Sequence, residues 1–276
     1  MGFAGGLTGG LGLTQFVGME LSGRAALVTG ASRGVGAATA LMLARAGCNV
    51  AVNYNASAEA AGAVVDGCQE AGVRAIAVQG DVAEDAVCRR LVSEALNAFG
   101  RLDVLVNNAG TTEFIDFTDL EAVTDGVWDR IFAVNLKGPF QCARAAREHL
   151  AAQGGVIVNT ASVAGLRGAG SCIPYAASKA ALINLTVALA RTLGPEIRVN
   201  AVAPGFIAGD WLQRGLGDNY ESAKAAKAAD GLLDAVSTPK DIAQGIMAMV
   251  TADKVTGHTL VVDAGHTVGP RLGAGI

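Results

Sequence analysis

The feature that most constrains the fold is the alternation, from residue 25 onward, of short apolar runs rich in β-branched residues with longer helical stretches. Such alternation is typical of βαβ units, in which parallel strands are buried on both faces by the crossover helices. Candidate strands lie at residues 25–29, 49–54, 74–79, 102–107, 155–160, 197–202 and 259–263. The sequence therefore predicts one doubly wound α/β domain with a seven-stranded parallel sheet flanked by helices.

The segments between these strands support the same interpretation. Four predicted helices end at glycines, which accept the left-handed backbone that a helix exit often needs: Gly47, Gly72, Gly100 and Gly194. Ligands of such sheets bind at the carboxyl ends of the strands. The longest connection without a strand, residues 206–239, is rich in glycine, alanine and charge, and we expect it to form a partly helical substrate flap near that edge.

Composition and charge exclude several classes of function. The net charge of -4 is spread without a basic cluster, so neither nucleic acid nor a membrane surface is an expected partner. The five cysteines form no CxxC pair and the three histidines are scattered, which argues against a metal site and favours a reducing compartment. Residues 1–19 lack lysine and arginine and are rich in glycine, so we expect a mobile tail before a single domain at residues 20–276 in a cytoplasmic protein.

The stretch "TGASRGVG" at residues 29–36 follows the first predicted strand and opens a helix at about Val35. Gly30, Gly34 and Gly36 let the backbone pass close to a ligand, and a helix N-terminus favours an anion such as a pyrophosphate. The spacing differs from the common GxGxxG fingerprint, and tight-turn chemistry alone is the alternative. Its position in a βαβ unit favours a dinucleotide site.

The second predicted strand ends "VNYNAS", where a site that prefers NAD usually carries an acid for the ribose hydroxyls. Asn53 and Asn55 stand there instead, and Arg33 lies in the glycine turn. A carboxylate would repel the 2′-phosphate of NADP, whereas a guanidinium binds it. The sequence therefore predicts a preference for NADP(H), with a solvated turn residue as the alternative interpretation of Arg33.

Tyr175 and Lys179 stand four residues apart in "SCIPYAASKAALINL", so one helix face would carry both side chains. Pro174 is expected near the start of that helix. An adjacent ammonium lowers the pKa of a phenol, which would make Tyr175 a usable proton donor, although a surface pair is the alternative. Ser162, thirteen residues before the tyrosine, could donate a hydrogen bond to a carbonyl oxygen.

Taken together, the motifs resemble those of the classical short-chain dehydrogenase/reductase family from about Leu21 to Gly265. They are "TGASRGVG", "GDV" with Asp81, "NNAG" at residues 107–110, "VN" with Asn135, Ser162, "YAASK" at residues 175–179 and "APG" at residues 203–205. The resemblance implies a single Rossmann-type domain, and such proteins are commonly homotetramers.

The resemblance also implies roles for individual residues. Ser162 would polarise the substrate carbonyl, Tyr175 would transfer the proton, Lys179 would bind the nicotinamide ribose and lower the tyrosine pKa, and Asn135 would hold a water in a proton relay. The cofactor-binding residues it implies are Gly30, Ser32, Arg33, Gly34, Val35, Gly36, Asn53, Asp81, Val82, Asn108, Ala109, Gly110, Tyr175, Lys179, Pro204, Gly205 and Ile207. Of these, Asp81 and Val82 would contact adenine and residues 204–207 would approach the carboxamide.

The implied activity is an oxidoreductase that interconverts a ketone and a secondary alcohol with NADP(H), most like the 3-oxoacyl-[acyl carrier protein] reductase-like and glucose dehydrogenase-like branches. Two departures from these branches are notable. The threonine that often follows "PGFI" is replaced by Ala208, Gly209 and Asp210, and "VDAG" stands where "VDGG" is more usual.

Alternatives remain at this point. They are an NAD-dependent sugar or polyol dehydrogenase and a non-catalytic nucleotide-sensing protein of the same fold. An enoyl reductase is excluded by pattern, because that branch separates the tyrosine and lysine by six residues. No motif in residues 206–239 identifies the substrate.

Overall fold

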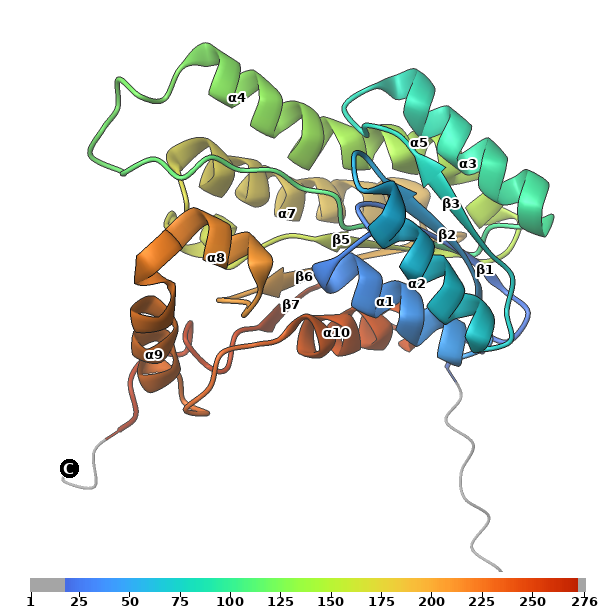
Figure 1. Cartoon of the computed structure of the whole chain (residues 1–276). Coiled ribbons are helices and arrows are strands. Elements are labelled where there is room, and N and C mark those ends of the chain that lie inside the picture. The colour runs from blue at the N-terminus through green and yellow to red at the C-terminus, as the bar shows by residue number, and fades with distance from the viewer. Residues whose placement is uncertain (1–17, 273–276) are drawn as a thin grey trace, which may run out of the picture.

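The computed structural model describes residues 18–272. Its seven strands form one sheet in the order β3-β2-β1-β4-β5-β6-β7, and every neighbouring pair is parallel (Figure 1). The strands are β1 (Ala25–Val28), β2 (Asn49–Tyr54), β3 (Ala75–Gln79), β4 (Val104–Asn107), β5 (Val156–Thr160), β6 (Arg198–Pro204) and β7 (Thr259–Val262). All seven predicted strands are confirmed, and the reversal of strand order beside β1 and β4 creates the crevice in which such sheets bind ligands.

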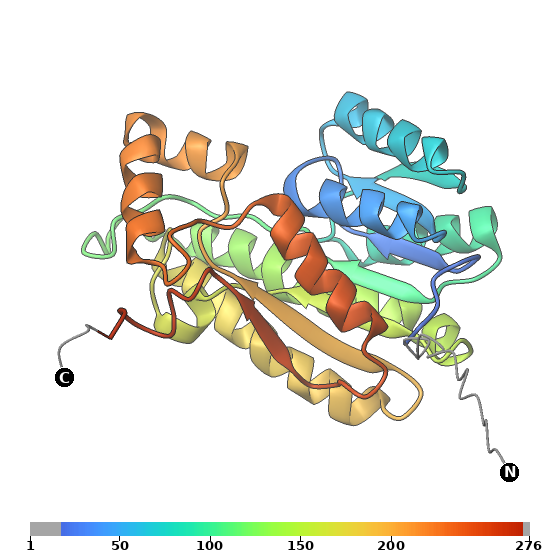
Figure 2. The ribbon, with the colours of Figure 1, turned by 90° about the horizontal axis from the view of Figure 1, so that it is seen from below.

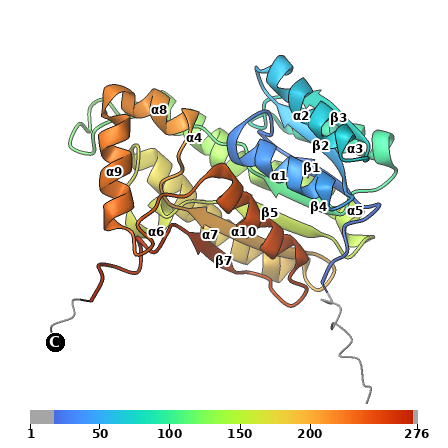
Figure 3. The same ribbon diagram turned by 60° about the horizontal axis from the view of Figure 1, so that its bottom comes forward.

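Ten α-helices surround the sheet within the described residues. They are α1 (Gly34–Arg45), α2 (Ala58–Glu70), α3 (Asp85–Phe99), α4 (Asp125–Phe132), α5 (Gly138–Ala151), α6 (Ala164–Arg167), α7 (Ile173–Leu193), α8 (Asp210–Leu216), α9 (Tyr220–Asp230) and α10 (Pro239–Thr251). Helices α1, α2 and α10 cover one face of the sheet, and α3, α5 and α7 cover the other (Figures 2 and 3). The molecule therefore has three layers.

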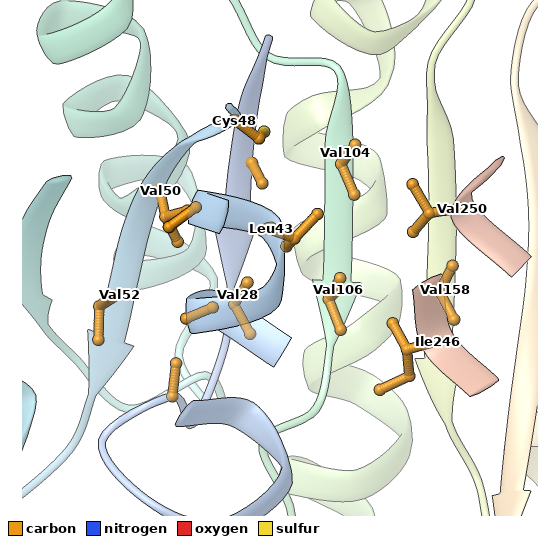
Figure 4. Packing of buried hydrophobic residues seen from close by; sticks show 14 of the residues in the cluster. Val28, Leu43, Cys48, Val50, Val52, Val104, Val106, Val158, Ile246 and Val250 are labelled. Atoms are coloured by element: carbon orange, nitrogen blue, oxygen red, sulfur yellow. The ribbon is translucent and has the colours of Figure 1, made fainter. Parts of the chain in front are cut away.

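Strand residues alternate between the two faces, so each face has its own apolar core. In β1, Ala26 and Val28 pack in the cluster under α1 and α10, whereas Ala25 and Leu27 pack in the cluster on the opposite face. Figure 4 shows the first cluster, where Leu43 of α1 lies over the strand valines. Because both faces are buried, the strands read as nearly continuous apolar runs.

One helix in the described part of the chain, α7, is long and apolar enough to cross a membrane by length and composition. It packs against β6, α4 and α6 in the structure. Pro174 occupies its first turn, as predicted. The apolar character of α7 is therefore that of a core helix.

The start of the domain differs from the prediction. Residues 1–17 of the expected tail lie outside the described residues, but Met19 is 9% exposed and belongs to the core cluster under α1 and α10. Its backbone N–H donates to the Thr251 carbonyl at 3.2 Å. The packed core thus includes Met19, one residue before the expected start of the domain.

Three of the four predicted helix-ending glycines have the expected left-handed backbone, with φ of 84° at Gly47, 86° at Gly72 and 76° at Gly100. Gly194 does not, since it follows α7 with φ -74° and ψ 150°. The residue after it is Pro195, whose ring disfavours helical geometry at the preceding residue and pushes it to extended backbone. The proline therefore determines this helix exit.

The long connection between β6 and α10 is partly helical, as predicted. It contains α8, a short 3₁₀ segment at Gly217–Asn219 and α9. A bridge between Ile207 and Ser237 joins its two ends. The segment leaves from the carboxyl end of β6 and stands at that edge of the sheet (Figure 1).

Candidate active site

The three glycines of the first turn are needed for different reasons. Gly30 and Gly34 have φ of 60° and 57°, in the left-handed region that favours glycine. A Cβ on Gly36 would lie 2.5 Å from the Gly30 carbonyl oxygen and from Asn108 Nδ2, so only glycine fits there. The turn is therefore compact, and its backbone N–H groups at the start of α1 are available to bind a ligand.

Thr29 and Asn108 attach this turn to the loop after β4. The Thr29 hydroxyl accepts hydrogen bonds from the backbone N–H groups of Asn108 and Ala109, both at 3.0 Å. Asn108 Nδ2 in turn donates to the carbonyls of Thr29 and Gly30 at 3.0 and 3.1 Å. Sequence reasoning placed Asn108 and Ala109 at the cofactor cleft but gave no role to Thr29, although it is the first residue of the quoted "TGASRGVG" motif.

Asn53 lies beneath the glycine turn and does not face its outer side. Its side chain is 1% exposed, and its Oδ1 accepts from the Gly30 N–H at 3.1 Å. Its Nδ2 donates to the carbonyls of Val78 and Gly80 at 3.2 and 3.0 Å. Both polar atoms of this side chain thus bind main-chain groups of the glycine turn and of the end of β3, so its direct observable role is to hold the turn, and a cofactor contact by Asn53 stays a prediction.

Arg33 lies at the exposed end of the turn, where its Nη2 donates to the Ser57 hydroxyl. Ser57 precedes the first residue of α2, close to the end of β2. Helix α1 has no side-chain cap at its N-terminus and no acid in its first turn, and Ser32 and Val35 are partly exposed beside it. Sequence reasoning missed Ser57, although a serine immediately before a helix is a recognisable signal.

Asp81 and Val82 belong to the loop after β3. The Asp81 carboxylate accepts from the Ala83 N–H at 3.0 Å and forms an ion pair with Arg130 at 2.8 Å. The Val82 carbonyl accepts from Gln141 Nε2 at 3.1 Å. These contacts fix the loop to α4 and α5, and sequence reasoning missed both partner residues.

Tyr175 and Lys179 lie on one face of α7, as predicted. Lys179 is 4% exposed, its Nζ donates to the Thr160 carbonyl at 2.7 Å, and the same atom lies 5.7 Å from the centre of the Tyr175 ring. Burial lowers the pKa of Lys179 from 10.5 to about 8. Thr160 also has a buried hydroxyl with no hydrogen-bond partner. At the end of β5, the main-chain carbonyl of Thr160 thus accepts from a buried amine, while its side-chain hydroxyl is buried without a partner.

The pKa of Tyr175 differs from the expectation that the lysine would lower it. Burial raises that pKa, and hydrogen bonding to Ser162 acts in the opposite direction. Ser162, at the end of β5, accepts a hydrogen bond from the Ala164 N–H at 3.1 Å. The structure thus brings Ser162, Tyr175 and Lys179 together at one edge of the sheet.

Asn135 lies in a π-helical segment, Ala133–Lys137, between α4 and α5. Such segments are frequent at functional sites. Asn135 Oδ1 accepts from the Thr111 N–H at 2.8 Å, and its Nδ2 donates to the Ser178 hydroxyl at 3.1 Å. A Cβ on Gly110 would lie 3.5 Å from Asn135 Oδ1 and 3.8 Å from Lys179 Nζ. Gly110 therefore leaves room beside both predicted catalytic residues.

The end of β6 is held close to β7. The Gly205 N–H donates to the Val262 carbonyl at 3.0 Å, and a Cβ on Gly205 would lie 2.6 Å from the Cβ of Asp263. Pro204 ends β6, and Ile207 forms the bridge to Ser237. Position 205 therefore requires glycine because two strands approach closely there.

The two departures from the family pattern have structural correlates. Gly209, in the stretch that replaces the threonine, donates from its N–H to the Tyr220 hydroxyl at 3.1 Å and has a φ of 147°. Ala264, the alanine of "VDAG", has a φ of 56° and therefore adopts a left-handed backbone that a glycine would take more readily.

The comparisons agree with this geometry. A sequence profile described as short chain dehydrogenase matches residues 24–219. The chain belongs to the short-chain dehydrogenase family. It is thus an NAD(P)-dependent oxidoreductase that acts on CH–OH groups. It is 43% identical over 243 residues to a Streptomyces violaceoruber protein assigned as ketoacyl reductase 2 of the granaticin polyketide synthase, with 87% of this chain and 94% of the relative covered.

Two further relatives extend the comparison. The 3-oxoacyl-[acyl-carrier-protein] reductase FabG of Staphylococcus aureus is 40% identical, with 88% of this chain and 97% of the relative covered. The crystal structure of a short-chain dehydrogenase from Burkholderia cenocepacia in complex with NADP is 38% identical, with a TM-score of 0.82, and covers 90% of this chain and 100% of that one. The family is thus supported by sequence and by three-dimensional structure.

The residues of this chain fit the nicotinamide dinucleotide that the family uses. The close approach at Gly36 and the uncapped N-terminus of α1 suit a pyrophosphate, since free backbone N–H groups bind anions. At another point of the same edge, Lys179 Nζ and Asn135 Oδ1 are polar atoms that lie close to Gly110. When bound, the nicotinamide supplies or accepts the hydride, and the protein supplies orientation and the proton.

Proposed function

We propose that this enzyme interconverts a ketone and a secondary alcohol with a preference for NADP(H), and that its substrates resemble 3-oxoacyl compounds. The observation that carries the proposal is the assembly of Ser162, Tyr175 and Lys179 at the carboxyl edge of the sheet. The pairing of Arg33 with Ser57 at the glycine turn supports the choice of cofactor, since no carboxylate stands at the end of β2 to repel a phosphate.

The residue chemistry suits a carbonyl reductase. The Ser162 hydroxyl would donate a hydrogen bond to the substrate carbonyl, and the Tyr175 phenol would transfer the proton to the same oxygen. Burial raises the pKa of Tyr175, so the phenol is protonated at neutral pH, as a proton donor must be. Lys179 would bind the nicotinamide ribose, and Asn135 would hold the water of a proton relay. Both would position the reacting groups.

The relatives support the substrate class. Two of them are named as reductases of 3-oxoacyl or ketoacyl groups, and a third was crystallised with NADP. A homotetramer in the cytoplasm remains a prediction.

The test is steady-state kinetics of the purified enzyme with 3-oxobutanoyl N-acetylcysteamine thioester and each of the two reduced cofactors. We expect kcat/KM to favour NADPH over NADH by at least about tenfold, because a charge-assisted hydrogen bond to the 2′-phosphate contributes on the order of 1.5–3 kcal/mol. Arg33→Ala should remove most of that preference by weakening NADPH alone. Arg45→Ala, which changes an exposed arginine at the other end of α1, is the matched control.

If Arg33→Ala lowers kcat/KM equally with NADPH and with NADH, the arginine is a turn residue that does not bind the 2′-phosphate. A wild-type enzyme that prefers NADH would also contradict the cofactor assignment. Absence of turnover with the thioester, together with turnover of a sugar or polyol, would overturn the substrate class.

A further inference from the structure

The ring of Phe114 lies directly against the backbone of Gly215 in α8. A Cβ built on Gly215 would stand 1.9, 2.1 and 2.4 Å from three carbons of that ring. No real side chain fits at such distances, so the contact exists only because residue 215 is glycine. Phe114 belongs to the loop between β4 and α4, and α8 belongs to the segment after β6 (Figure 3). The contact therefore joins two segments that are far apart in the sequence.

The Phe114 loop is fixed to the segment immediately before the helix that carries Tyr175. The Ile115 N–H donates to the Ser171 carbonyl at 2.9 Å, and the hydroxyls of Thr112 and Ser171 are hydrogen-bonded at 2.5 Å. One residue earlier, a Cβ on Gly170 would lie 3.5 Å from the Tyr175 ring. A short series of contacts thus leads from the catalytic tyrosine to Phe114.

Helix α8, by contrast, is attached weakly. None of its residues is buried. It lies between Gly209, with φ 147° and ψ -178°, and Gly217, with φ 51° and ψ -129°. The first of these conformations is essentially restricted to glycine, and both residues can absorb a large change of backbone angle. The following helix is anchored, because Tyr220 is 6% exposed and stacks on Phe206.

We propose that Phe114 and Gly215 form a latch that holds α8 over the site of Ser162 and Tyr175, and that the Phe114 ring limits the size of the ketone substituent which the closed site accepts. The proposal rests on the proposed function for its substrate class. It assigns Phe114 as a specificity-determining residue and Gly215 as the position that allows the ring to seat. The Trp211 side chain, 44% exposed on α8, reports whether the helix is closed.

Gly215→Ala is the variant that opens the latch. The added methyl group must displace either the ring or the helix, although alanine itself favours helix formation, so the fold should be retained. We expect kcat/KM for 3-oxobutanoyl N-acetylcysteamine thioester to fall by about 100-fold, because small displacements near a reacting centre have effects of that size. The control is Gly62→Ala in α2, where a Cβ would meet no atom within 4 Å.

Phe114→Ala in the Gly215→Ala background tests whether both changes act through the same contact. We expect Phe114→Ala to lower kcat/KM for the 3-oxobutanoyl thioester less in this background than in the wild-type enzyme, because the contact is already lost and the effects of residues in direct contact are not additive. If the two losses are fully additive, or if Gly215→Ala behaves as Gly62→Ala does, the latch is overturned.

The position of α8 can be measured without turnover. In a Trp128→Phe background, Trp211 is the sole tryptophan. We expect Gly215→Ala to increase the quenching of Trp211 fluorescence by acrylamide, relative to the Trp128→Phe parent and to Gly62→Ala in the same background. Unchanged quenching would overturn the latch even if activity is lost. An enzyme that reduces no ketone but shows the increased quenching would contradict the proposed function and retain the latch.

The size limit has its own measurement. Removing the ring in Phe114→Ala should raise the ratio of kcat/KM for the 3-oxodecanoyl thioester to that for the 3-oxobutanoyl thioester by about tenfold or more. A ratio equal to that of the wild-type enzyme would overturn Phe114 as the specificity-determining residue.

Discussion

The glycine turn at residues 29–36 and helix α8 both stand at the carboxyl edge of the sheet, yet different contacts hold them. The turn is fixed from below and from the side by the buried side chain of Asn53 and by Asn108. Helix α8 has no buried residue, and the ring of Phe114 lies against its Gly215 backbone. The half of the site that suits the cofactor is thus preorganised by buried hydrogen bonds, whereas the half that would meet the substrate is held by a helix with no buried residue.

Tyr175 stands between these two halves, and its replacement should have the largest effect. Tyr175→Phe removes the phenolic hydroxyl and little volume, so we expect kcat to fall by about 100-fold to 10,000-fold while cofactor affinity is retained. The measurements are steady-state turnover and binding of NADPH by fluorescence titration. Retention of more than about a tenth of the wild-type rate would contradict the role of the tyrosine as proton donor. Loss of NADPH binding by this variant would show that the phenolic hydroxyl of Tyr175 acts in cofactor binding.

The rigidity of the cofactor half can be tested with two glycines of one turn. Gly36→Ala should reduce the free energy of unfolding by about 3 kcal/mol, because its Cβ would collide with backbone atoms that cannot move aside. Gly34→Ala meets no neighbouring atom within 4 Å, and its φ of 57° alone should make the effect about 1–2 kcal/mol. Urea denaturation measures both, and equal effects would mean that the turn is not held as tightly as the structure indicates.

The buried amine of Lys179 should destabilise the fold in a pH-dependent way. Its pKa is about 8 in the folded protein and 10.5 in an exposed lysine, so between these values the unfolded state binds more protons and stability rises with pH. Lys179→Met should therefore be more stable than wild type at pH 7, by roughly 1–3 kcal/mol, and this advantage should shrink toward pH 10. Denaturation at the two pH values measures it. A difference that does not change with pH would contradict the buried charge.

The smallest change in stability is expected at Ala264, just after the carboxyl end of β7. Ala264→Gly replaces a left-handed alanine with the residue that tolerates a φ of 56° best. The relief of backbone strain exceeds the added chain entropy only slightly, so we expect a gain of about 1 kcal/mol or less in the free energy of unfolding. Calorimetry would detect it as a higher Tm, and a lower Tm would show that the alanine methyl group packs favourably.

Much of the fold could be predicted from the sequence, because strand periodicity and glycine placement are local signals. The seven strands follow from such signals, and the pairing of Tyr175 with Lys179 follows from helix spacing, whereas their joint site with Ser162 was expected from the resemblance to the family. Gly194 shows the limit of this approach, since a neighbouring proline determined its conformation and the usual preference of glycine did not.

What the sequence could not reveal depends on tertiary contacts. Burial, which raises the pKa of Tyr175, is a property of the packed protein and has no signal in the spacing of two residues. The contact between Phe114 and Gly215 joins segments about a hundred positions apart in the sequence. A lone glycine in a flap gives no indication that an aromatic ring packs against it. The carbonyl partners of Asn53 were equally hidden.

The arrangement around Asn53 has a consequence for any redesign of this enzyme's choice between the phosphorylated and the unphosphorylated coenzyme. An aspartate at this position has no N–H to offer, so it would remove the hydrogen bonds that Asn53 donates to the carbonyls of Val78 and Gly80 and place a buried charge beside them. Such a change would damage the scaffold before it altered selectivity. The residues to engineer are those on the solvent side of the turn, Arg33 and Ser57, where a new acid can meet the ribose and remain hydrated.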